Sequence, residues 1–173
     1  MNINSIEKLL IEELGDLHSA ERQITKALPK MIKAATSKEL QSALEHHLRE
    51  TEGHVQRLEE AFKAFGTNAS SKTCEGMKGI IEEGERSMKS AEEGEFRDLA
   101  IISGAQRVEH YEMAAYGSAR TFARLLGQEK AAELLQSTLD EESETNESLN
   151  QLAESMVNPE ALSGTELTAD SRQ

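Results

Sequence analysis

Apolar residues recur every three or four positions along most of the chain, the spacing of one face of an α-helix. The pattern predicts four long helices, over residues 5–35, 37–66, 95–126 and 128–157. A shorter amphipathic helix is expected over residues 74–89. Residues 158–173 have little apolar content, so we expect them to form a flexible tail. The pattern therefore predicts an all-α protein.

Turn and capping residues divide the four long helices into two hairpins. Thr36 is the expected N-cap of the second helix, with Glu39 completing a capping box, and Gly127 should end the third helix. Pro29 should kink the first helix or force a local adjustment. About 29 residues join the two hairpins, enough to travel the length of a bundle. Residues 1–157 are therefore expected to form a ferritin-like antiparallel four-helix bundle, whose one long crossover carries the short fifth helix.

Three glutamates stand where the helical pattern calls for apolar residues. Glu21, Glu109 and Glu142 each lie within roughly 20–30° of the centre of an apolar stripe. Burying an unpaired carboxylate costs several kcal/mol or more. Each carboxylate therefore needs a proton, a buried arginine or lysine, or a metal ion. Without metal, burial and mutual repulsion should raise the pKa of all three.

The order of these glutamates along the chain favours the metal alternative. Carboxylate-bridged di-metal sites in helical bundles use a Glu from two helices and a Glu with a nearby His from the other two. The candidate metal ligands are Glu21, Glu50, His54, Glu109, Glu112 and Glu142. Glu50 lies at the margin of its stripe, and His54 follows it at i+4 instead of the usual i+3. A solvated Glu50, a hydrogen-bonded His54 and an exposed or interface Glu112 are the structural alternatives.

Four further residues lie near this pattern without a firm assignment. His47 also approaches the apolar stripe of its helix, and Asn146 is a weak oxygen donor one turn after Glu142. Tyr116 lies on the Glu109 stripe and could hydrogen-bond a ligand or sense a radical, but it is better explained as a core tyrosine. Cys74 is interpreted as a small core residue.

Composition and charge narrow the class of protein. The chain has 19 basic and 32 acidic residues, for a net charge of −13, which disfavours direct binding of nucleic acid or an anionic membrane. Its single cysteine excludes an intramolecular disulfide. The first residues, MNINSIEKLL, lack the features of a signal peptide, and no stretch is apolar enough to span a membrane. We expect a cytoplasmic protein.

Longer strings of residues resemble a known family. The strings are LGDLHSAERQITKALPKM, HHLRETEGHVQRLE, AQRVEHYEMAAYG and LLQSTLDEES. With them, residues 3–157 resemble the YciF-type ferritin-like stress proteins of bacteria. The resemblance implies a homodimer, stress-linked expression and two metal ions held by the six candidate ligands above. The chain departs from related patterns at His54, which replaces the i+3 histidine of ferritins and rubrerythrins, and at Asn146, where many relatives carry an acid.

We therefore expect a stress-response protein with a di-iron, di-manganese or mixed site and no organic cofactor. Whether it is an oxidoreductase that reduces peroxide or oxidises ferrous iron stays open from the sequence. The alternative is a non-enzymatic structural or interaction protein with a weak or vestigial metal site. An iron-storage cage has the same fold, but the family resemblance points to a dimer.

Overall fold

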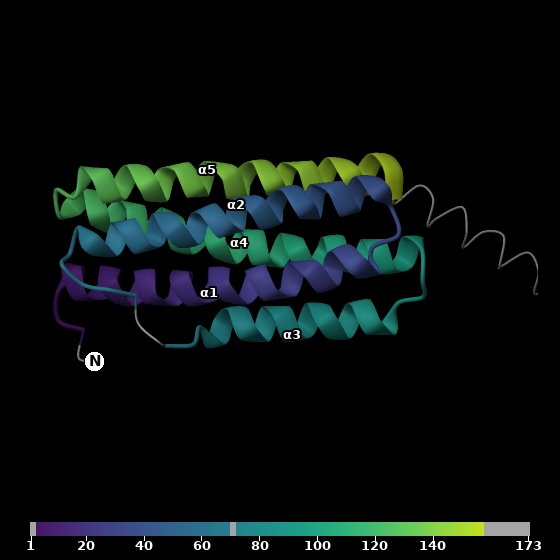
Figure 1. The fold of residues 1–173 in the computed structure, drawn as a ribbon, viewed down its shortest axis with the longest axis horizontal. Coiled ribbons are helices and arrows are strands. Elements are labelled where there is room, and N and C mark those ends of the chain that lie inside the picture. The colour runs from purple at the N-terminus through teal and green to yellow at the C-terminus, as the bar shows by residue number, and fades with distance from the viewer. Residues whose placement is uncertain (1–2, 70–71, 158–173) are drawn as a thin grey trace, which may run out of the picture.

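The computed structural model of the chain describes residues 3–69 and 72–157, and all the regular structure in those residues is helical (Figure 1). The helices are α1 Ile6–Ala34, α2 Lys38–Lys63, α3 Glu75–Ser90, α4 Glu95–Leu125 and α5 Glu129–Leu152, followed by a π-helical turn, Ala153–Val157. The tail expected over residues 158–173 lies outside the described residues. None of the described helices is long and apolar enough to cross a membrane.

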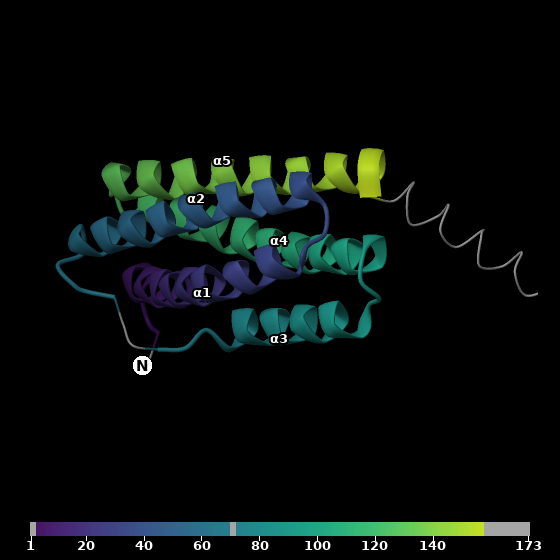
Figure 2. The same ribbon diagram turned by 45° about the vertical axis from the view of Figure 1, so that its right-hand side comes forward.

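Four long helices lie side by side, and the short helix α3 packs on their outer surface. Helices α1 and α2 form one antiparallel hairpin, and α4 and α5 form the other (Figure 1). Helix α3 lies along the crossover between the hairpins, against α4 and α1 (Figure 2). The expected ferritin-like four-helix bundle with a helix in its crossover is confirmed.

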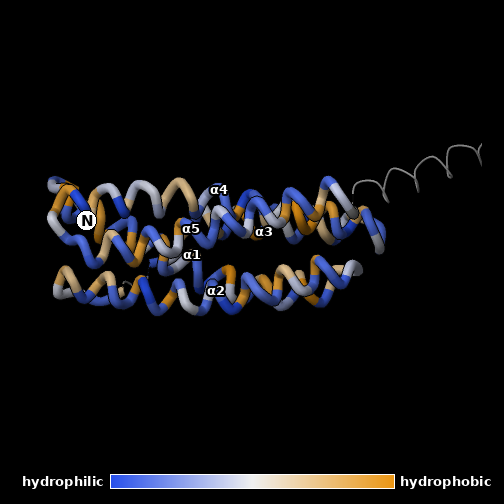
Figure 3. The backbone as a smooth tube through the Cα atoms, turned by 90° about the horizontal axis from the view of Figure 1, so that it is seen from above, coloured by the Kyte–Doolittle hydropathy of each residue, from blue (hydrophilic) through white to orange (hydrophobic). Residues whose placement is uncertain are grey.

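The apolar core is divided into two halves along the bundle. One half surrounds Ile24, Leu44 and Ile102, and the other surrounds Leu58 and Leu135. Apolar and polar segments alternate along every helix, as amphipathic helices require (Figure 3). Between the two halves, each helix of the bundle turns polar side chains inward. The fold therefore encloses a polar layer at the middle of its length.

The start of α2 differs from the expected capping box. Ser37, not Thr36, is the N-cap, and its Oγ accepts a hydrogen bond of 3.2 Å from the amide of Leu40. The buried carboxylate of Asp98 accepts 2.7 Å hydrogen bonds from the amides of Thr36 and Ser37. Glu39 instead accepts a bond from the Ser37 hydroxyl. The prediction of Thr36 was wrong: the helix begins one residue later than expected, and Asp98 occupies the Thr36 amide to which Glu39 would have reached back.

The other helix boundaries follow local backbone preferences. Gly127 has a φ of +69°, the left-handed conformation common just after a helix, and it directly follows the C-cap of α4. Gly66 has a φ of +61° in the turn after α2. Helix α1 continues through Pro29 to Ala34, so the proline does not end it.

Candidate metal centre

Six ionisable side chains form the polar layer. Its members are Glu21 on α1, His47 and His54 on α2, Glu109 and Glu112 on α4, and Glu142 on α5. All four glutamates are 0% exposed, and the two histidines are 2% exposed or less. The inward orientation expected from the apolar stripes is therefore confirmed for Glu21, Glu109 and Glu142, and Glu112, for which an exposed position was equally open, is buried as well. This layer, which we call the Glu4His2 layer, contains all the fully buried glutamates of the described residues.

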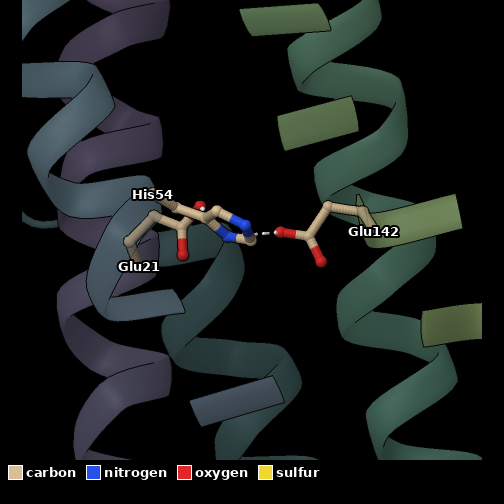
Figure 4. A group of neighbouring side chains, drawn as sticks. All are labelled: Glu21, His54 and Glu142. Atoms are coloured by element: carbon tan, nitrogen blue, oxygen red, sulfur yellow. Dashed lines mark ion pairs between the residues drawn. The ribbon is translucent and has the colours of Figure 1, made fainter. Parts of the chain in front are cut away.

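Donor atoms of the Glu4His2 layer gather into two groups of three. Glu21, His54 and Glu142 form the first triad, and His47, Glu109 and Glu142 form the second. Within each triad one donor atom per residue lies within 4.8 Å of the others. Figure 4 shows Glu21 and His54 facing Glu142 across the bundle interior. Because Glu142 belongs to both triads, it is placed to bridge two ions.

The first triad is supported by an ion pair behind the His54 ring. His54 Nδ1 lies 3.0 Å from Glu142 Oε1 and 3.4 Å from Glu21 Oε1. On the other side of the ring, Nε2 lies 2.8 Å from Glu141 Oε2. Arg57 donates two hydrogen bonds to Glu141, of 2.6 and 2.7 Å. A carboxylate that accepts a hydrogen bond from Nε2 fixes the ring orientation. The lone pair of Nδ1 is then available to bind a metal ion in the layer.

A buried tyrosine holds the α1 glutamate of the first triad. Tyr116 is 0% exposed, and its hydroxyl donates a hydrogen bond to Glu21 Oε1. Burial, and then the negative charge of Glu21, raise the pKa of Tyr116 well above its usual value. The tyrosine is therefore both a core residue and a positioning partner of Glu21.

The second triad has fewer partners. His47 Nε2 lies 3.3 Å from Glu109 Oε1, and Nδ1 lies 4.0 Å from Glu142 Oε2. Within the described chain, neither ring nitrogen of His47 makes a hydrogen bond, nor does either carboxylate oxygen of Glu109 or Glu112. A buried polar atom without a hydrogen-bond partner lowers the free energy of unfolding. This side of the layer therefore has unused nitrogen and oxygen atoms that could bind a ligand accepting lone pairs.

Among the described residues, no arginine or lysine side chain neutralises the Glu4His2 layer. Among ion pairs of the described residues, the buried glutamates pair only with His47 and His54. Arg57, which approaches the layer from α2, is engaged by Glu141 outside it. Of the three means of neutralisation open from the sequence, the structure therefore leaves protons and metal ions.

The electrostatics of the layer show where positive charge is favoured. Burial raises the pKa of Glu21, and burial with neighbouring carboxylates raises those of Glu109 and Glu112 well above the usual range. Burial alone lowers the pKa of His54, but the Glu142 and Glu21 carboxylates raise it to about 10. For Glu142, burial is outweighed by the two histidines, so its pKa is lowered. The expected rise at Glu142 was wrong because His54 lies so close.

Glu50 does not join the other candidate ligands inside the bundle. Its carboxylate lies 3.0 Å from His46 Nδ1, its side chain is 22% exposed, and it belongs to neither triad. His47 instead completes the layer from α2, although it was not among the six candidates. The signal for it was present in the sequence, because His47 and His54 are seven residues apart and so share one face of α2. Asn146 is half-buried, and its buried Oδ1 makes no hydrogen bond within the described residues.

A polar groove opens beside the second triad, between α2 and α5. It has a volume of about 480 Å³ and is lined by Glu39, His46, Glu50 and Glu144 together with His47. Because His47 lines the groove and belongs to the second triad, its side chain lies between the groove and the Glu4His2 layer.

Comparison with protein families identifies the relatives of this chain. Residues 5–162 match the profile of a family described as "Domain of unknown function (DUF892)". The chain belongs to this family. Protein YciF of Escherichia coli K12 is 42% identical over 162 residues, covering 93% of this chain and 98% of that protein. The resemblance to YciF-type proteins that the sequence indicated is confirmed.

Three solved structures share the bundle. The crystal structure of the E. coli stress protein YciF matches with a TM-score of 0.86 and 41% identity, over 90% of this chain and 99% of that chain. YcfI from Rhodopseudomonas palustris, described as a candidate structural protein, matches with a TM-score of 0.83 and 40% identity, over 86% and 95%. A Xanthomonas campestris protein shares the fold at 17% identity, with a TM-score of 0.73. This chain is thus a homologue of a bacterial stress protein.

Proposed function

We propose that this protein takes part in a stress response by binding two divalent ions, iron or manganese, in the Glu4His2 layer. The observation that carries the proposal is a set of four fully buried carboxylates whose ion-pair partners, among the described residues, are two histidines. The grouping of their donor atoms into two triads that share Glu142 supports a pair of ions over a single one.

Charge balance also favours two divalent ions. Four ionised glutamates and two neutral histidines carry a charge of 4 × (−1) + 2 × 0 = −4, which two divalent cations cancel. Glu21 and His54 would hold one ion, His47 and Glu109 the other, and Glu142 would contact both. Glu112 is an additional carboxylate within the layer. Mixed imidazole and carboxylate donors suit iron and manganese.

Residues around the layer would orient these ligands. Tyr116 holds Glu21, while Arg57 fixes Glu141 and through it the ring of His54. When bound, a pair of redox-active ions supplies the electron transfer needed to reduce peroxide or to oxidise ferrous iron. The surrounding apolar core excludes bulk water from the layer.

The polar groove would provide the route by which cations enter. Glu39, Glu50 and Glu144 give its lining an acidic character, and His47 connects it to the second triad. Negative potential in a groove raises the local concentration of cations. In this proposal Glu50 guides ions toward His47 instead of holding them in the final site.

A non-enzymatic structural or interaction role is the second candidate. The description of the R. palustris relative as a candidate structural protein favours it. In that case the buried glutamates keep protons permanently, as the raised pKa values of Glu109 and Glu112 allow.

Metal content separates the two candidates. Protein purified without chelator, or titrated anaerobically with Fe²⁺ or Mn²⁺, should bind about two ions per chain, measured by elemental analysis and calorimetry. Glu142→Gln should reduce the content because it removes the charge that both triads share. Glu133→Gln, an exposed position on the same helix, should retain full binding. Wild-type protein that ignores both metals would favour the structural role.

A further inference from the structure

The first triad holds its own two ligands by hydrogen bonds from outside the layer. His54 Nε2 lies 2.8 Å from Glu141 Oε2, so that Nδ1 faces the layer. Glu21 Oε1 accepts the hydrogen bond from Tyr116, while Glu21 Oε2 makes no hydrogen bond within the described chain. Each side chain therefore has one atom held by an outer partner and another atom available to an ion.

The second triad lacks such outer partners among the described residues. Neither ring nitrogen of His47 and neither carboxylate oxygen of Glu109 makes a hydrogen bond there. His47 Nε2 lies 3.3 Å from Glu109 Oε1, but this contact joins the two ligands to each other. No hydrogen bond from outside the layer therefore fixes the orientation of either side chain.

The two triads also differ in their access to solvent. His47 lines the polar groove between α2 and α5. A second pocket, between α1, α3 and α4, opens to solvent beside Lys30 and ends on His47 and Glu109. Neither Glu21 nor His54 lines either of these two openings. The second triad is therefore the more accessible half of the layer.

An ion pair covers the first triad behind the His54 ring. Arg57 donates two hydrogen bonds to Glu141, and the side chains of this pair are 30% and 27% exposed. His54, which Glu141 contacts, is fully buried. Release of an ion past this ring therefore requires the Arg57–Glu141 pair to open.

We propose that the first triad retains its ion, while the second triad exchanges its ion with the surrounding solution. This division of roles rests on the proposed di-metal function. Each outer partner of a metal ligand typically contributes about 10–100-fold to metal affinity, and only the first triad has such partners in the described chain. Repulsion from the retained ion, which shares Glu142, weakens the second ion further. Occupancy of the second triad then follows the concentration of free divalent cation.

Stepwise addition of Mn²⁺ to the metal-free full chain tests the order of filling. The first equivalent should give the electron paramagnetic resonance spectrum of isolated Mn²⁺, and the second equivalent should convert it to that of a spin-coupled pair. The two dissociation constants, measured by calorimetry, should differ by at least about tenfold. From fully loaded protein, a chelator should remove one ion per chain rapidly and the other slowly, as followed by elemental analysis.

Variants assign the two ions to the two triads. Tyr116→Phe removes the hydrogen bond to Glu21 and should weaken the slowly released ion by about 10–100-fold, so that the first equivalent also gives coupled pairs. Tyr111→Phe is the matched control on the same helix, because its hydroxyl lies 3.0 Å from Cys74 Sγ and not at the layer. It should behave as the wild type. Glu109→Gln should lose the rapidly released ion and keep the slow one, and it serves if Tyr116→Phe does not fold.

The outcomes separate this division of roles from the di-metal function. Coupled pairs from the first equivalent of wild-type protein, or two ions lost at the same rate, would overturn the division of roles and leave the di-metal function standing. Loss of the slowly released ion in Glu109→Gln would do the same. Wild-type protein that binds no Mn²⁺, or only one ion, would refute the di-metal function and the division of roles with it.

Discussion

Glu142 and His54 are the residues on which the candidate centre most depends. Glu142 is shared by both triads, and His54 lies between it and Glu21, where two carboxylates raise the histidine pKa to about 10. A position that attracts a proton so strongly also attracts a metal ion, and the two compete for it. The layer therefore retains a preference for positive charge whether or not metal is present.

Arg57 should act as a positioning residue for the first triad. In Arg57→Ala, Glu141 loses the bidentate hydrogen bonds from Arg57 and no longer fixes the orientation of the His54 ring. Loss of such a supporting carboxylate typically lowers metal affinity by about 10–100-fold. Calorimetric titration with Mn²⁺ measures this affinity. Arg49→Ala, at an exposed position on the same helix, should leave it unchanged; an equal loss in both variants would contradict the assigned role.

Glu50 should affect the rate of metal loading and not the amount bound. In Glu50→Gln the groove loses negative charge, while both triads remain intact. Loading followed by Co²⁺ absorbance should be slower, with unchanged final stoichiometry. Glu109→Gln, inside the second triad, should instead lower the stoichiometry. If Glu50→Gln lost an ion, Glu50 would be the ligand that the sequence first indicated.

At the scale of elements, contacts between helices decide details that no single helix specifies. Helix α2 supplies both histidines of the layer and α4 supplies two of its glutamates, so the donor set is unevenly divided between helices. Similarly, Asp98 of α4 binds the turn between α1 and α2 and thus joins the two hairpins.

Asp98→Ala should destabilise the bundle as a whole. The variant leaves the amides of Thr36 and Ser37 without their charged acceptor. Hydrogen bonds to charged groups contribute about 1.5–3 kcal/mol each, so we expect a loss of about 3 kcal/mol in the free energy of unfolding. Urea denaturation measures it. Asp140→Ala, at an exposed position on α5, is the control and should change stability little.

At the scale of the whole molecule, the polar layer couples stability to pH. In metal-free protein the raised pKa values of Glu109, Glu112 and His54 mean that the native state keeps protons which the unfolded chain releases. Stability should therefore fall as pH rises above about 4.5, where the two glutamates of the unfolded chain ionise, and above about 6.5 for His54, toward its folded pKa near 10. The lowered pKa of Glu142 acts only in the acidic range, below its usual value of 4.5.

The melting temperature of metal-free protein measures this dependence. It should decline as pH rises above about 5, and it should decline less in the double variant Glu109→Gln, Glu112→Gln, which lacks the two glutamate protons. Mn²⁺ at about 100 times its dissociation constant should stabilise the wild type by about 2.7 kcal/mol. A melting temperature that declines with pH but does not respond to metal would indicate glutamates that hold their protons permanently. The homodimer implied by the family resemblance stays a prediction, to be measured by sedimentation.

The local pattern of the chain was sufficient to predict the helices, the two hairpins and the inward direction of the Glu21, Glu109 and Glu142 side chains. Helix periodicity determines which face is buried, and that information is carried by neighbours within a few residues. Only the tertiary structure could assign the roles of three other residues, His47, Glu50 and Thr36. Their roles depend on the rotation of α2 relative to α4 and α5 and on Asp98, 62 residues beyond Thr36. Packing between helices decides such contacts, because a side chain at the margin of a stripe turns inward or outward according to its neighbours.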